Sequence, residues 1–135
     1  MDKVFLDANV LFAAAFRGDD ELRRIWELSS AMLMTSSTAA EEARRSVRAR
    51  APRCASTLDG LLSSLITVDA VRAGFLPPSP ELPETGRPIL LAAIDAKATH
   101  LLTGDHRHFG RYRNQMVHGV RILTPADYLQ AKRRR

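Results

Sequence analysis

The chain has 135 residues, which is enough for one folded domain. Hydrophobic residues make up 45% of it and charged residues 26%, a composition that excludes a disordered polypeptide. No apolar run approaches the roughly 20 residues of a membrane-spanning helix, and Asp2 and Asp7 interrupt any signal-peptide core, so we expect a cytoplasmic protein without membrane contact. The formal net charge is +5 and the pI about 10.1, which suits a nucleic-acid partner but is also ordinary for a soluble surface.

Apolar runs bounded by turn and capping residues predict the order of the secondary-structure elements. In chain order we expect a strand at 4–6, a helix from Asp19 or Asp20 to about residue 30, a strand at 32–34, helices at about 39–50 and 53–63, a strand at 65–68, a proline-restricted loop at 74–86, a helix from Pro88 to about residue 97, strands at 101–103 and 120–123, and a last helix capped by Thr124.

The predicted strands are apolar throughout and alternate with helices. This pattern is typical of a parallel sheet that is covered on both faces. We therefore expect a three-layer α/β/α domain at residues 1–131, followed by a basic tail at 132–135.

Acidic residues follow three of the predicted strands. Asp7 ends the apolar run VFLD, Asp105 follows residues 101–103, and Glu42 lies on the helix after residues 32–34. Ligands of parallel sheets bind beyond the carboxyl ends of the strands. We therefore expect these three carboxylates to lie at one edge of the sheet.

Three adjacent carboxylates repel one another, by about 4 kcal/mol for a pair 4 Å apart at an effective dielectric of 20. Protons can relieve this repulsion by raised pKa values. A hard divalent cation does so better, and an oxygen-only ligand set selects Mg²⁺ or Mn²⁺. Such an ion can activate water and stabilise the leaving oxygen of a phosphodiester.

Each acid also has a structural interpretation. Asp7 can cap a helix that begins near Ala8 or Asn9, and Asp105 in Thr-Gly-Asp can be a turn residue. For Glu41 the structural interpretation is the stronger one. The pattern Thr38-Ala-Ala-Glu41 fits a capping box, and Glu41 can pair with Arg45 one turn on.

Other metal and phosphate chemistries fit the sequence less well. The single cysteine, Cys54, is expected to be a half-buried thiol, and the four histidines lack the spacing of a zinc site. Asn9 stands where a phosphatase with an Asp-x-Asp motif has its second acid, and we expect it to orient Asp7. No Walker-type glycine loop is present.

The segments LDANVLF, TSSTAAEEARR and RPILLAAIDAKATHLLTGDHRHFG resemble a PIN domain over essentially the whole chain. The resemblance implies five parallel strands in the order 3-2-1-4-5 and a metal-dependent nuclease. It implies that Asp7, Glu42 and Asp105 are catalytic residues that bind Mg²⁺ or Mn²⁺, with Thr103 as a polar support. It also implies a ribonuclease toxin of the VapBC type, an antitoxin partner and a homodimer.

The sequence departs from the PIN pattern at one position. The family has a further acid two residues before the proline of the helix at 88–97, where this chain has Gly86. Glu84 is a possible replacement, because its loop lies at the same edge. Asp95 is a poor one, since seven residues of helix place it about 10 Å farther along the axis.

Two functions therefore stay open. The first is a metal-dependent endoribonuclease whose basic residues hold the RNA backbone. The second is a degenerate PIN domain that binds RNA or a protein without cleaving it, as Gly86 would favour. The residues that we expect to contact nucleic acid are Arg44, Arg45, His106, Arg107 and His108.

Overall fold

The computed structural model describes residues 1–17, 20–69 and 87–133. The elements, in chain order, are β1 (Asp2–Leu6), α1 (Ala8–Arg17), α2 (Asp20–Arg23), the 3-10 helix η1 (Arg24–Glu27), β2 (Ala31–Ser36), α3 (Ser37–Arg50), η2 (Pro52–Cys54), α4 (Ala55–Ser63), β3 (Ile66–Val68), α5 (Arg87–Asp95), β4 (His100–Leu102), α6 (His106–Phe109), η3 (Gly110–Tyr112), β5 (Met116–Val117), β6 (Val120–Leu123) and α7 (Pro125–Arg133). The predicted loop at 74–86, which contains Glu84 and Gly86, lies outside the described residues.

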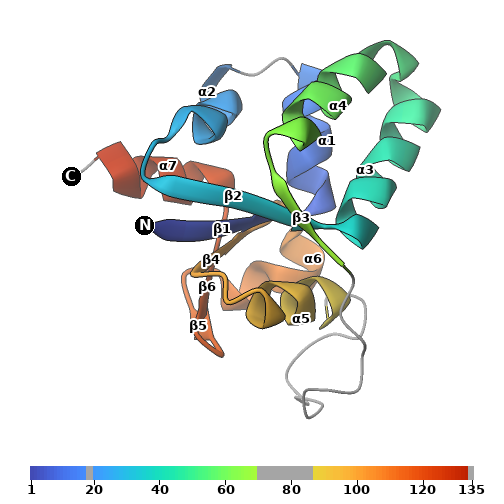
Figure 1. The fold of residues 1–135 in the computed structure, drawn as a ribbon. Helices are drawn as coiled ribbons and strands as arrows, with labels where there is room; N and C mark the ends of the chain where they lie inside the picture. The colour runs from blue at the N-terminus through green and yellow to red at the C-terminus, as the bar shows by residue number, and fades with distance from the viewer. Residues whose placement is uncertain (18–19, 70–86, 134–135) are drawn as a thin grey trace.

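The strands form one sheet in the order β3-β2-β1-β4-β6-β5 (Figure 1). All neighbouring pairs except β5 and β6 are parallel. The five parallel strands are the five that the sequence predicted. Their order confirms the 3-2-1-4-5 arrangement that the resemblance implied.

The expectation of five strands is wrong by one, because β5 adds an antiparallel edge strand. Met116 pairs with Arg121 and Val117 with Val120, which leaves a loop of two residues. Both loop residues have positive φ, 48° at His118 and 86° at Gly119. Positive φ at both positions is typical of a tight hairpin turn, and glycine adopts it without strain. A strand of two residues is too short to produce a recognisable apolar pattern.

Helices cover both faces of the sheet, as predicted. Figure 1 shows α1, α3 and α4 on one side and α5 and α6 on the other. Successive residues of a strand point to opposite faces. Val4 and Leu6 of β1 therefore enter the core on one side and Phe5 the core on the other, and all three are fully buried. This double coverage explains why the strands are apolar throughout.

Helix α3 begins earlier than the sequence predicted, and the expected capping box of Thr38 and Glu41 is wrong. Ser36 caps the helix: its backbone is extended, and its hydroxyl accepts a hydrogen bond from Ala39 N at 3.0 Å. Because Ser36 is also the last residue of β2, the helix starts directly at the carboxyl end of that strand. Strand and helix are therefore joined without a loop, which fixes where α3 starts relative to the sheet.

The predicted helix from Asp20 to about residue 30 is shorter than expected. It has one turn of α-helix and continues as the 3-10 helix η1, after which Leu28 is extended. Trp26 of η1 is half-buried and donates its indole N–H to the carbonyl of Leu61 at 3.1 Å. This contact to the neighbouring helix α4 and the full burial of Ile25 in the core hold the segment in place.

The last helix begins as predicted, since Asp127 N donates to the Thr124 hydroxyl at 3.0 Å. Helix α7 extends to Arg133, and Lys132 pairs with Asp2 at 2.7 Å. Among the described helices, none has the length and apolar character needed to span a membrane.

Candidate functional site

Asp7 lies at the point where β1 ends and α1 begins. Its backbone N–H donates to the carbonyl of Leu102, and its own carbonyl accepts from Val10 N and Leu11 N. The carboxylate Oδ1 accepts from Ala8 N at 2.7 Å, and the residue is only 6% exposed. The helix N-terminus favours a negative charge at this position. Asp7 is therefore both a helix-terminal residue and the most buried acid of the site.

Thr103 and Asn9 connect Asp7 to the loop after β4. The Thr103 hydroxyl donates to Asp7 Oδ2 at 2.7 Å and accepts from Asp105 N at 3.0 Å. Asn9 Oδ1 accepts from Gly104 N at 2.9 Å, while Asn9 Nδ2 makes a longer contact of 3.4 Å to Asp7 Oδ2. These bonds fix the Asp7 carboxylate and the backbone of Asp105 in one network, and both supporting residues lie where the sequence analysis placed them.

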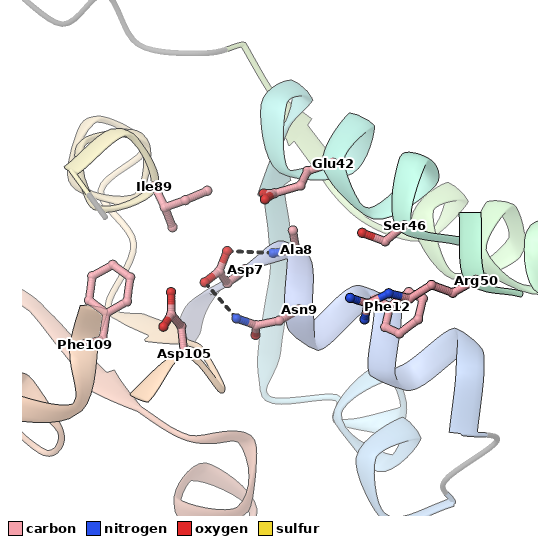
Figure 2. A pocket seen from close by; sticks show the side chains of 10 residues that line it. All are labelled: Asp7, Ala8, Asn9, Phe12, Glu42, Ser46, Arg50, Ile89, Asp105 and Phe109. Carbon is pink, nitrogen blue, oxygen red and sulfur yellow. Dashed lines mark hydrogen bonds between the residues drawn. The ribbon is translucent and has the colours of Figure 1, made fainter. Parts of the chain in front are cut away.

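Glu42 faces this network from α3. Glu42, Ser46 and Arg50 recur every four residues, so they lie on one side of the helix and line the same pocket as Asp7 (Figure 2). The neighbouring Glu41 points elsewhere, because it pairs with Arg45 at 3.7 Å and with Arg48 at 3.2 Å. The structure thus separates the two adjacent acids as the sequence predicted, with Glu42 toward the pocket.

The third acid, Asp105, completes the polar part of the pocket. It comes from the loop between β4 and α6, and Figure 2 shows its carboxylate beside Asp7 on the side opposite α3. The pocket has a volume of about 460 Å³, and Ile89 and Phe109 form an apolar wall. Acids from three separate elements therefore line one cavity at the carboxyl edge of the sheet.

The surroundings of Asp7 disfavour the ionised form of its carboxyl group. Burial raises the pKa of its carboxyl group, and the carboxylates of Glu42 and Asp105 raise it further. The hydrogen bonds from Thr103 and Ala8 act in the opposite direction and only partly compensate. A positive charge in this pocket would remove the repulsion, which is the electrostatic condition for binding a cation.

The donor set fits a hard cation such as Mg²⁺ or Mn²⁺, since the pocket offers carboxylate oxygens and no sulfur. Across residues 1–17, 20–69 and 87–133, however, no three His, Cys, Asp or Glu side chains lie close enough together to form a finished metal-binding group. The pocket therefore has suitable ligands, which would have to approach one another around an ion.

The other predicted site residues are placed as follows. Arg44 and Arg45 lie on other sides of α3, where Arg44 faces Asp59 at 3.8 Å and Arg45 faces Glu41. His106 and Arg107 are exposed at the start of α6, next to Asp105. The side chain of His108 and the whole of Glu84 lie outside what the structure describes. Asp95 is exposed at the far end of α5 and does not line the pocket.

Sequence reasoning missed several side chains of the pocket lining, among them Phe12 and Arg50. Phe12 is on α1, and the Arg50 guanidinium carbon lies 5.7 Å from the centre of its ring. The sequence analysis counted Arg50 only as part of a basic cluster. Its spacing from Glu42, two steps of four residues through Ser46, was the signal that could have assigned it to the same side of α3.

No protein-family model matches the chain, and no curated protein matches its sequence. Solved structures do match. A chain of VapBC2 from Rickettsia felis, solved bound to a DNA fragment from the promoter, has a TM-score of 0.66 at 18% identity, covering 90% of this chain and 98% of that one. A toxin–antitoxin complex from Klebsiella pneumoniae gives 0.65 at 19% identity, covering 90% and 97%.

A third solved structure is VapC20 from Mycobacterium tuberculosis, described as a toxin that cleaves the sarcin–ricin loop. Its TM-score is 0.56 at 14% identity, covering 77% of this chain and 91% of that one. At these identities the likeness establishes the fold and leaves the activity to be argued from the site. The fold of this chain is that of the VapC toxins, a PIN-like fold.

Proposed function

We propose that this protein is a metal-dependent endoribonuclease. The observation that carries the proposal is the arrangement of Asp7, Glu42 and Asp105, which come from three separate elements and line one pocket. In this proposal the three carboxylates hold Mg²⁺ or Mn²⁺, with Glu84 as a possible fourth ligand. The ion would supply charge neutralisation and activation of water at a phosphodiester.

The remaining residues of the pocket have roles that follow from their contacts. Thr103 and Asn9 hold the carboxylate of Asp7 in one orientation. Arg50 presents a guanidinium at the same pocket and would pair with a phosphate of the substrate. Phe109 would exclude water from one side of the reacting group.

The matched structures support the choice of RNA and of an antitoxin partner. One of them is described as a toxin that cleaves the sarcin–ricin loop, and another as a toxin–antitoxin complex. We propose by analogy that this chain is the toxin of a VapBC-type pair, acts in the cytoplasm on RNA and pairs as a homodimer. Growth arrest on expression, relieved by co-expressing a small neighbouring gene, is the expected result for a toxin.

Titration of Mn²⁺ by calorimetry, together with cleavage of a labelled RNA, tests the nuclease. Asp7→Asn and Glu42→Gln should each lose both metal binding and cleavage. Glu41→Gln is the matched control, because Glu41 is the adjacent acid on α3 and faces Arg45 and Arg48 instead of the pocket. Loss in Glu84→Gln would identify Glu84 as a further ligand. Cleavage that persists in Asp7→Asn at the level of the unmodified protein would contradict the proposal.

A second candidate function is a PIN-like module that binds RNA or a protein without cleaving it. It is favoured by Gly86, which stands in place of the family's further acid. This alternative predicts no Mn²⁺ binding at millimolar concentration. Mn²⁺-dependent cleavage that disappears in Asp105→Asn would exclude it.

A further inference from the structure

A stack of two aromatic rings and two guanidinium groups extends from the carboxylate pocket. Phe12 and Phe16, one turn apart on α1, have nearly parallel rings with centres 5.4 Å apart. Arg50 lies over the ring of Phe12 at 5.7 Å, and Arg53 lies over the ring of Phe16 at 5.8 Å. The end of α3 and the start of η2 thus hold two cations against one face of α1.

The outer part of this stack is open to solvent. Phe16 is 41% exposed, whereas Phe12 is half-buried and packs against the main core. The exposed ring of Phe16 contributes little to the core, and together with Phe12 and Arg53 it presents an aromatic surface to solvent. Burial of Phe12 therefore explains why that ring is there, but it does not explain Phe16.

The two arginines of the stack also differ from the other arginines of α3. Arg44 is paired with Asp59, and both Arg45 and Arg48 are paired with Glu41. Within the described part of the chain, Arg50 and Arg53 have no carboxylate within 4.0 Å. Arg53 therefore carries its positive charge beside an exposed ring, and Arg50 carries its charge at the edge of the carboxylate pocket.

The stack is continuous with the candidate site, since Phe12 and Arg50 line the pocket that contains Asp7, Glu42 and Asp105 (Figure 2). Flat apolar rings next to uncompensated guanidinium groups match the chemistry of a nucleotide, whose base stacks and whose phosphate pairs with arginine. A base within a duplex is already stacked on its neighbours, so such a surface suits an unpaired base.

We propose that Phe16 and Arg53 form a subsite for one unpaired nucleotide of a single-stranded RNA segment, next to the phosphate held at the carboxylate pocket. This inference rests on the proposed ribonuclease function, because that function places the neighbouring phosphate at the carboxylate pocket. It adds a position at which a base takes the face of Phe16 over which Arg53 lies, while Arg53 turns from the ring to the phosphate. Single-stranded segments of RNA are then the preferred substrate class.

Binding of a fluorescent single-stranded RNA, followed by anisotropy in EDTA, tests the subsite without cleavage. Phe16→Ala should weaken binding about fivefold or more, since one stacked base contributes about 1–3 kcal/mol and 1.4 kcal/mol is tenfold. The matched control is Met116→Ala, which removes an apolar side chain that is 55% exposed on the edge strand β5. Phe16→Trp should retain the affinity, and quenching of its new indole by RNA would report the stacking directly.

An RNA series that carries one abasic nucleotide at successive positions provides the decisive comparison. At one position the unmodified protein should lose as much affinity as Phe16→Ala loses with intact RNA. Phe16→Ala should lose nothing further with that same abasic RNA. Equal losses from the abasic change in both proteins at every position would overturn the proposal, as would the lack of RNA binding by the unmodified protein.

Arg53→Ala separates the phosphate contact from stacking. Loss of one phosphate contact to a single strand should lower the slope of log K against log salt concentration by about 0.7. Phe16→Ala should leave that slope unchanged, and Arg24→Ala, which removes an arginine already paired with Glu21, should change it less than Arg53→Ala does. An unchanged slope in Arg53→Ala would contradict its assignment.

Two further measurements keep this inference separate from the proposed nuclease. Light scattering of Phe16→Ala detects whether the ring belongs to an interface between copies, and a change of oligomeric state without a change of RNA affinity would overturn the subsite. Mn²⁺-dependent cleavage of RNA is measured in parallel. Stacking without cleavage would refute the nuclease alone, whereas cleavage that depends on Asp7, with unchanged RNA binding in Phe16→Ala, would refute the subsite alone.

Discussion

Replacing the buried acid of the site is expected to stabilise the protein when no divalent ion is present. Burial raises the pKa of Asp7, and the carboxylates of Glu42 and Asp105 raise it further. A group whose pKa is higher in the folded than in the unfolded state opposes folding once it ionises, so stability is lost as the pH rises through the folded-state pKa. Asp7→Asn removes that ionisation and keeps the shape of the side chain.

The size of the effect follows from the contacts that Asn retains. The amide oxygen can still accept from Ala8 N, whose present distance to Asp7 Oδ1 is 2.7 Å. The amide N–H₂ replaces the Oδ2 acceptor, so the bond with the Thr103 hydroxyl forms only in the reverse direction, once that hydroxyl turns its own proton away. One hydrogen bond is therefore kept and one is reversed, while the charge repulsion is removed. We expect a gain of about 1–2 kcal/mol, within the range of about 0.5–2 kcal/mol that single stabilising substitutions commonly give. At about 4 °C per kcal/mol, the melting temperature should rise by about 4–8 °C.

Addition of Mn²⁺ should reverse the order of the two proteins. A ligand that binds only the folded state stabilises it by about 2.7 kcal/mol at one hundred times its dissociation constant. The unmodified protein should gain this stabilisation and Asp7→Asn should not. Thermal unfolding followed by circular dichroism, in EDTA and in Mn²⁺, measures the melting temperatures of the two proteins without and with the ion.

The reasoning is refuted if Asp7→Asn melts below the unmodified protein in EDTA, because the carboxylate would then be a net stabilising group. An equal rise in melting temperature with Mn²⁺ in both proteins would refute the metal assignment alone. Glu41→Gln is the control for removing one negative charge from α3, and its melting temperature should respond to Mn²⁺ like that of the unmodified protein.

Three further predictions concern groups around the site and the fold. Ser36→Ala removes the cap of α3 and should lower stability by about 1 kcal/mol, measured by urea unfolding. Thr103→Val leaves Asp7 Oδ2 and Asp105 N without the Thr103 hydroxyl, so it should lower stability by about 1–3 kcal/mol and weaken Mn²⁺ binding. Thr103→Ser should restore both. Hydrogen bonding to Arg113 lowers the pKa of Asp127 to about 2, so the contribution of this carboxylate to stability is present above pH 4 and lost toward pH 2. The stability of the unmodified protein relative to Asp127→Asn should therefore fall across that pH range, and a constant difference would contradict this.

The parts of the site that could be predicted are those that topology determines. Asp7 directly follows β1, and Asp105 follows β4, which is its neighbour in the sheet. Because parallel strands end at one edge, their positions along the chain were sufficient to bring these residues together. Glu42 could be separated from Glu41 because neighbouring residues of a helix point in directions about 100° apart.

The parts that could not be predicted depend on packing between elements distant in the chain. Arg50 and Phe12 meet because α1 and α3 lie side by side, and no local pattern specifies that contact. The cap of α3 was misassigned for a related reason. Ser36, Ser37 and Thr38 are all good capping residues, and only the pairing of Ser36 with Val68 shows where the strand ends and the helix begins.

The two halves of the candidate site differ in how firmly they are held. The Thr103 hydroxyl joins the Asp7 carboxylate to the backbone of Asp105, so these two acids are fixed by the central strands β1 and β4. Glu42 is exposed on α3, and within the described residues no hydrogen bond joins it to Asp7. Its effect on Asp7 is exerted through charge. The step from three separate carboxylates to a metal-binding group therefore depends on the distance between α3 and the central strands. The Ser36 cap fixes where α3 begins at the end of β2, and the packing of α3 against α1 and α4 holds the rest of the helix.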